Sequence, residues 1–146
     1  MVRFRMFRIH TDQFAILSET APVDFDEVGM GVAFSYKVAE DCKIAATIKL
    51  SFDTFDNGKQ PLMMIEVTCE YLINEDDWKG MIKGDVLNVT KETLEYLTAQ
   101  AVGVTRGILH CKTEDTPFSV LIIPPLNVAK MITSGLKASI TELSKL

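Results

Sequence analysis

The sequence has few of the residues from which metal centres and catalytic sites are built. It contains three cysteines and two histidines, and no Cys-x-x-Cys or His-Glu-x-x-His motif. His110 and Cys111 are neighbours, but adjacent residues on a helix point in different directions, so the pair does not predict a nucleophile with its base. No glycine-rich phosphate loop follows a predicted strand. We therefore expect neither an enzyme nor a cofactor.

Basic runs and long apolar runs are also missing. The formal net charge is -5, which argues against nucleic acid as the main partner. No apolar run approaches the roughly 20 residues of a membrane span, and the N-terminal segment alternates charge with apolar residues, unlike a secretory signal. The cysteines Cys42, Cys69 and Cys111 are odd in number and far apart, which fits a reducing cytoplasm. We expect a single cytoplasmic domain, residues 1–146, with no direct membrane insertion.

What the chain does have is a long series of apolar and polar residues in alternation, the period of half-buried strands. In the first such segment, residues 2–17, the alternation slips, which predicts a bulge or bend around Thr11-Asp12. Three further strands follow, with Asp56-Asn57-Gly58 as a tight turn before the last. Their apolar faces are Val28, Met30, Val32, Phe34, Tyr36 and Val38; Ile44, Ala46, Ile48, Leu50 and Phe52; and Met63, Ile65, Val67, Cys69, Tyr71 and Ile73.

Four consecutive strands joined by short turns predict an antiparallel meander with one apolar face. The other face would carry mostly polar side chains. These are Lys49, Glu66, Thr68 and Glu70, with Met64 and Leu72 among them.

Two helices are predicted after the strands. Leu94, Leu97, Ala101, Val104 and Ile108 recur in three-then-four steps and form one apolar stripe. A second stripe begins after Asn127, a good N-cap, although Gly135 weakens its middle. Its members are Val128, Met131, Ile132, Leu136, Ile140 and Leu143. The expected fold is α+β: a four-stranded antiparallel sheet with two helices packed on one face.

Small residues at Ala99, Gly103 and Gly107 lie four apart on another face of the first helix. This spacing lets a second backbone approach closely. Because glycine inside a helix costs about 1 kcal/mol against alanine, the stripe suggests a packing contact, with fraying at Gly107 as an equal alternative.

The segment between the last strand and the first helix, residues 74–89, is expected to be a crossover loop. It carries the only tryptophan, Trp78, either as a plug packed on the sheet or as part of a binding element; we favour the plug.

In this order the segments resemble the SecB family of export chaperones, nearer to divergent SecB-like members. The resemblance depends on short motifs spread along nearly the whole chain, of which the most specific is Pro-Pro-x-Asn after Arg106-Gly107. The motifs are Arg8-Ile9-His10-Thr11 with Ala21-Pro22, Ile65-Glu66-Val67, Arg106-Gly107, and Thr116-Pro117 followed by Leu121-Ile122-Ile123-Pro124-Pro125-Leu126-Asn127-Val128.

The resemblance implies a nucleotide-independent chaperone, a holdase, that binds unfolded preproteins and delivers them to the SecA motor of the translocon. It implies a homotetramer, a dimer of dimers, which would use Ala99, Gly103 and Gly107 as an oligomer interface. Its candidates for the client-binding groove are Tyr71, Leu72, Trp78, Leu126 and Met131. For each of these, packing in the core is an equal alternative.

Contact with the motor is implied at Glu66, with Met64 beside it. The match fails at Gln13 and Leu17, where the family has acidic residues, and the acidic tail that helps to engage the motor has no counterpart after Ser144-Lys145-Leu146. Two alternatives therefore remain beside the export chaperone. One is a SecB-like chaperone dedicated to one partner, such as an aggregation-prone antitoxin. The other is a small-ligand-binding domain of the same fold with the crossover loop as a lid.

Overall fold

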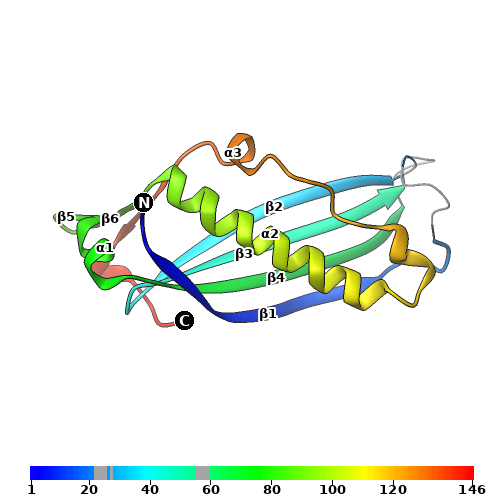
Figure 1. The fold of residues 1–146 in the computed structure, drawn as a ribbon, viewed down its shortest axis with the longest axis horizontal. Helices are drawn as coiled ribbons and strands as arrows, with labels where there is room; N and C mark the ends of the chain where they lie inside the picture. The colour runs from blue at the N-terminus through cyan, green and yellow to red at the C-terminus, as the bar shows by residue number, and fades with distance from the viewer. Residues whose placement is uncertain (22–25, 27, 55–59) are drawn as a thin grey trace.

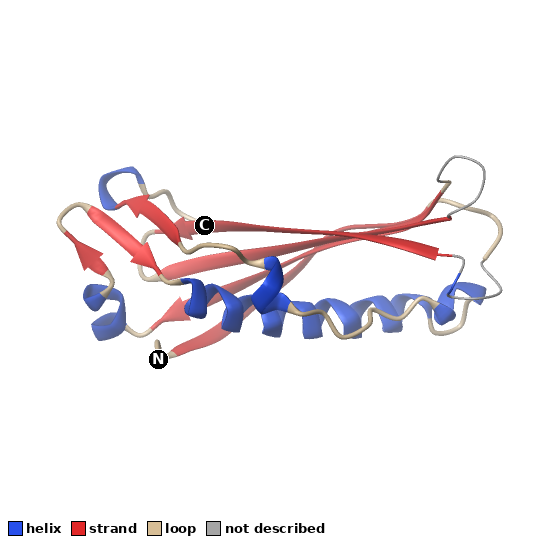
Figure 2. Ribbon diagram, turned by 90° about the horizontal axis from the view of Figure 1, so that it is seen from above, coloured by secondary structure: helices blue, strands red, loops and turns tan. Residues whose placement is uncertain are grey.

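The protein folds into two layers, as the computed structural model shows (Figure 1). The structure describes residues 1–21, 26, 28–54 and 60–146. One layer is a sheet of four long antiparallel strands: β1 (Phe4–Ile16), β2 (Val28–Ala39), β3 (Lys43–Thr54) and β4 (Pro61–Ile73). The other is the long helix α2 (Lys91–Thr113) and the chain that returns beside it (Figure 2). The predicted α+β class, with an antiparallel sheet and a long covering helix, is confirmed.

The strand order is β1-β4-β3-β2, so β2, β3 and β4 form a meander and β1 pairs with β4. The prediction of a complete meander is wrong for β1. Residues 17–27 separate β1 from β2, which exceeds the roughly two to five residues of a hairpin loop. Alternation along a strand is a local signal and does not identify its neighbours. The predicted turn at Asp56-Asn57-Gly58, like Pro22, lies outside the described residues.

Strand β1 is irregular at two places. The register with β4 shifts between Thr11 and Gln13, which confirms the predicted bulge, and also between Met6 and Arg8. A bulge inserts one extra residue opposite the partner strand. The extra residues here are Phe7 and Asp12. Asp12 accepts a hydrogen bond from Thr68 of β4 at 2.5 Å, on the sheet face away from α2.

The core lies between α2 and the apolar faces of β3 and β4. Ten side chains of these two strands have no exposed surface: Ile44, Ala46, Ile48, Leu50, Phe52, Met63, Ile65, Val67, Cys69 and Tyr71. Tyr71 donates a hydrogen bond to the carbonyl of Leu97 in α2 at 2.6 Å, which satisfies its buried hydroxyl. Burial raises the pKa of Tyr71 well above its usual range, so the phenol stays neutral.

The buried face of α2 differs from the predicted stripe in its second half. Val104 and Ile108 are half-buried, whereas Thr105, Leu109 and Thr113 are buried. The threonine hydroxyls donate to carbonyls of their own helix, Thr105 to Ala101 at 2.7 Å and Thr113 to Leu109 at 2.9 Å. Because their polar atoms are satisfied inside the helix, these threonines can face the core.

The predicted second long helix does not form. Instead α3 (Val128–Met131) is a single turn, and β7 (Leu136–Ser139) pairs with β6 (Val86–Val89) in a second sheet that includes β5 (Ile82–Lys83). Residues 136–139 pair with β6 instead of continuing the helix. At Gly135 the chain passes close to the start of α2, where an added Cβ would be 2.4 Å from the carbonyl oxygen of Val89.

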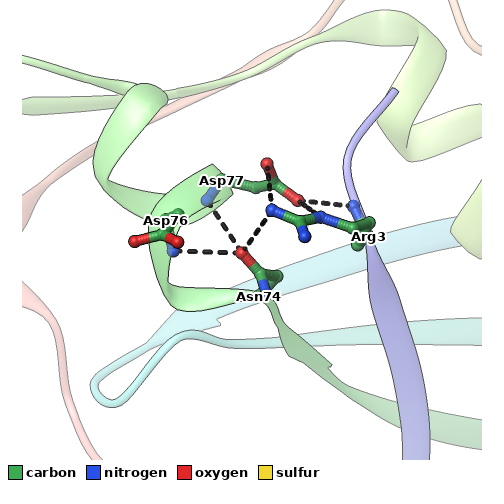
Figure 3. A network of polar contacts seen from close by, with 4 residues as sticks. All are labelled: Arg3, Asn74, Asp76 and Asp77. Carbon is green, nitrogen blue, oxygen red and sulfur yellow. Dashed lines mark hydrogen bonds and ion pairs between the residues drawn. The ribbon is translucent and has the colours of Figure 1, made fainter.

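The crossover is also more ordered than a loop. It contains α1 (Glu75–Gly80), whose first turn is capped by the side chain of Asn74. Arg3 bonds both to Asn74 and to the carboxylate of Asp77, which ties the start of β1 to α1 (Figure 3). Trp78 on the same helix is 8% exposed and belongs to the core.

Candidate binding groove

The covering layer leaves part of the sheet open along β2. Helix α2 packs mainly on β3 and β4, and the helix-side residues Met30, Val32, Phe34 and Tyr36 of β2 remain half-buried. Between β2, the start of α2 and the segment 131–136 is a cavity of about 330 Å³. We call it the β2 groove. Its lining residues are Val32, Phe34, Tyr36, Leu94, Met131, Ile132, Thr133, Ser134, Gly135 and Leu136.

The wall of the groove opposite β2 is fixed by hydrogen bonds from side chains of α2. We call residues 121–136 the return segment, because they run back along the helix (Figure 1). Arg106 donates to the carbonyls of Ile123 at 2.7 Å and Pro124 at 3.1 Å, and Lys91 donates to the carbonyl of Ala129 at 2.9 Å. Two cationic side chains thus bind the backbone of a segment that has little regular structure of its own. This is the structural link between the Arg-Gly and Pro-Pro-x-Asn motifs.

The groove combines aliphatic and aromatic walls with the hydroxyl groups of Tyr36, Thr133 and Ser134. The hydroxyls of Tyr36 and Thr98 are 2.5 Å apart and connect β2 to α2. Burial raises the pKa of Tyr36, so this phenol stays neutral. None of the described lining residues is charged, so the groove suits uncharged side chains of a ligand, with apolar ones against Val32, Phe34 and Met131.

Beside the groove, strand β2 forms one edge of the four-stranded sheet. In the described chain, only the end of this edge is occupied, where Ala39 forms a bridge with Ser144 and Glu40 donates to the Ser144 carbonyl. The unpaired backbone groups of an edge strand are a template for another extended chain. The groove and the free edge are therefore adjacent, one suited to side chains and the other to backbone.

The structure places the five predicted groove residues in four environments. Met131, 41% exposed, lines the β2 groove, and Leu126 is half-buried beside the core. Tyr71 and Trp78 are core residues. Leu72 is on the opposite face of the sheet, where it lines a separate cavity of about 650 Å³.

Val32, Phe34 and Tyr36 are the residues of β2 that line the groove, and the sequence did not single them out. Their alternation is the same as that of the fully buried residues on β3. Only the strand order, which puts β2 at an edge, distinguishes the two sets.

The other predicted contacts lie on two further surfaces. Met64 and Glu66 are half-buried on the sheet face away from α2, where Glu66 is opposite Gln13 and Lys49. Ala99, Gly103 and Gly107 are exposed on α2, and an added Cβ at either glycine would meet no atom within 4 Å.

Reactive groups do not gather in the described parts of the chain. There, no three His, Cys, Asp or Glu side chains lie close enough to hold a metal ion. Burial raises the pKa of the Cys69 thiol to about 11, so it stays protonated, and His110 and Cys111 are both exposed on α2. Among the described helices, none is long and apolar enough to span a membrane.

A four-stranded antiparallel sheet covered on one side by a long helix is the fold of the SecB-like chaperones. A solved structure with this fold is that of Mycobacterium tuberculosis Rv1957, a SecB-like chaperone in complex with a ChAD peptide from the Rv1956 HigA1 antitoxin. The two chains match with a TM-score of 0.51 over 86% of this chain and 91% of that one, at 11% sequence identity. No protein-family model and no curated protein sequence matches the chain. The likeness is one of fold.

Proposed function

We propose that this protein is a SecB-like chaperone that holds an extended apolar segment of a client protein in the β2 groove. The observation that carries the proposal is the position of the groove directly beside the free edge of β2. A client segment that pairs with this edge would direct every second side chain to the helix side of the sheet, where the groove lies. Such binding needs neither a nucleotide nor a catalytic group.

The physical driving force is the burial of half-exposed apolar surface. Val32, Phe34 and Met131 each keep exposed area in the free protein. Removing apolar surface from water contributes roughly 25 cal/mol of favourable binding free energy per Å². Hydrogen bonds between backbones are the same for any client sequence. The apolar side chains of the client would therefore decide which segments bind most tightly.

For the client we favour one dedicated partner, such as an antitoxin, over preproteins in general. The support is the peptide in the Rv1957 complex, which comes from an antitoxin. Delivery to SecA through Met64 and Glu66 is the alternative. It is less favoured because the opposing Lys49 offsets the negative charge that such docking needs.

We further propose that the protein acts in the cytoplasm as a homotetramer. The support is the exposed face of α2 at Ala99, Gly103 and Gly107, where a second backbone has room to approach. A light-scattering mass tests this assembly independently of any client.

The first experiment is calorimetric titration with a permanently unfolded protein and with the same protein folded. We expect heat only with the unfolded form, and a negative heat-capacity change from apolar burial. The variant Met131→Asp should weaken binding by about tenfold or more, because a carboxylate would enter the groove. Ile122→Asp is the matched control: Ile122 is 52% exposed and lies outside the groove. Equal weakening by both variants would contradict the assignment of the site.

A second titration separates the two kinds of client. An unselective holdase should bind several unrelated unfolded proteins with affinities within about tenfold of one another. A dedicated chaperone should prefer its partner's segment by about a hundredfold or more.

A further inference from the structure

In the described chain, no helix packs along the sheet face away from α2 (Figure 2). We call it the outer face. The C-terminal segment reaches it beside β2, where Lys37 donates to the carbonyl of Lys145 at 3.5 Å. The strand register arranges its side chains in rows that cross the strands. The row nearest the β2–β3 turn consists of Arg5, Leu72, Lys43 and Ala39, and the next consists of Arg8, Glu70, Ala45 and Lys37.

Positive charge dominates these two rows. They hold four cationic side chains and one carboxylate, in a chain whose formal net charge is -5. Arg5, Arg8 and Lys37 are exposed, and Lys43 is half-buried. Among the described residues, neither Arg5 nor Lys43 has an ion-pair partner within 4 Å. Cations without internal partners create a positive local potential.

The one carboxylate in these two rows, that of Glu70, is buried. Glu70 is 5% exposed, and its Oε2 lies 3.2 Å from Nε of Arg8 and 3.5 Å from Nε2 of His10. It therefore holds Arg8 in place and offsets part of that charge, but it presents almost no negative surface to a partner.

An apolar centre lies within the charged rows. The bulge of β1 puts Phe7 on the outer face, with the Arg8 guanidinium 5.6 Å and the Lys43 Nζ 6.0 Å from the ring centroid. Leu72 lies between Arg5 and Lys43 and lines the cavity of about 650 Å³ together with Phe4, Ile73 and Cys42. The surface thus combines cations with a hollow that accepts a large apolar side chain.

We propose that this basic patch, made of Arg5, Phe7, Arg8, Lys37 and Lys43 around Leu72, docks an acidic segment of a partner protein. Carboxylates of the segment would pair with the cations, and one aromatic or aliphatic side chain would enter the cavity at Leu72. The patch is on the opposite face from the β2 groove, so a client and this partner can be bound together. Its charge is opposite to the acidic docking surface that the resemblance implies for SecA.

The neighbouring charges favour a peptide over a nucleic acid. The same cavity is lined by the carboxylates of Asp41 and Glu75, which would repel a continuous phosphate backbone. A peptide can place its acids over the rows and a neutral residue at this end. The acidic remainder of the chain further disfavours a polyanion.

The test uses the full chain and a synthetic peptide of about ten residues, roughly 33 Å when extended, in which Asp and Glu flank a central Phe. We expect binding that weakens as salt is raised, because exposed charges are screened. The double variant Arg5→Gln/Lys43→Gln should lower the affinity by about tenfold. Lys83→Gln/Lys137→Gln is the matched control: it removes the same charge from exposed positions on β5 and β7 and should leave the affinity unchanged.

Four results would each overturn the proposal. They are no binding of the acidic peptide, equal binding of a peptide with Asn and Gln in place of the acids, equal loss in the two double variants, and equal or tighter binding of an oligonucleotide of similar length. Circular dichroism establishes that both double variants are folded. Because Met131→Asp alters only the β2 groove, it should keep acidic-peptide binding, which separates failure of this proposal from failure of the client site.

Discussion

The two faces of the same sheet are built from alternating residues of the same strands, yet they differ in almost every property. On β3, Ile48 has no exposed surface and contributes to the core, whereas Thr47 faces outward and shares a hydrogen bond with Thr68 at 2.8 Å. The helix-side face is covered by α2 and the return segment, and in the described chain the outer face has no such cover. One face supplies stability, and the other is available to carry charge.

The helix-side face is itself covered by two different kinds of segment. β3 and β4 are sealed by a regular helix, but β2 is covered by the return segment, which holds its position through the hydrogen bonds of Arg106 and Lys91. The groove forms beside β2, where the sheet is no longer covered by a helix.

The largest contrast should come from neighbouring residues on opposite faces. Ile48→Ala removes buried methylene groups and leaves a cavity, so we expect the free energy of unfolding to fall by about 2–5 kcal/mol. Thr47→Ala loses one partly exposed hydrogen bond and should cost about 1 kcal/mol. Urea denaturation of both variants measures the difference. Similar losses would mean that the outer face is buried in solution, for example by another subunit.

The second effect concerns the attachment of the return segment. Arg106→Ala removes both hydrogen bonds to the carbonyls of Ile123 and Pro124, and should lower stability by about 1.5–3 kcal/mol. Amide hydrogen exchange should become faster in residues 121–136 but not in β3. Arg106→Lys is the control, since it keeps the charge but not the planar fork of donors, and should give an intermediate loss. Faster exchange throughout the chain would contradict a local role.

How far the sequence predicted this structure depends on how local each determinant is. The strands, the bulge at Thr11-Asp12 and the buried positions Leu94, Leu97 and Ala101 of α2 follow from strand and helix periodicity, which a short window contains. The prediction of a second long helix was wrong because residues 136–139 pair with β6, a contact between segments that are distant in sequence. Strand order likewise depends on long-range pairing. For this reason Val32, Phe34 and Tyr36 were expected to form an ordinary buried face, although they border the groove.

A smaller effect, a gain in stability instead of a loss, is expected on the face of α2 that points away from the sheet. An added Cβ at Gly103 would meet no atom within 4 Å. Gly103→Ala should therefore raise the free energy of unfolding by up to about 1 kcal/mol, because alanine is the better helix former. The measurement is thermal unfolding at several protein concentrations. A loss of stability that grows with concentration would instead show that Gly103 packs against another subunit.

The smallest effect should occur at the end of the sheet, where Arg3 joins β1 to α1 (Figure 3). The hydrogen bond from Arg3 lowers the pKa of Asp77 below its ordinary value of 3.8. The ionised form is thus stabilised by folding, and its contribution is complete above that ordinary value and is lost as the pH falls through the lowered pKa. Asp77→Asn should be slightly less stable than the wild type at neutral pH, and the difference should shrink as the pH falls below about 4.

Asp76→Asn is the control in urea denaturation across this range: Asp76 shares the first turn of α1 but does not bond to Arg3, so it should lack this profile. Identical profiles for the two variants would assign the effect to the helix terminus, and Arg3 would then have no part in it.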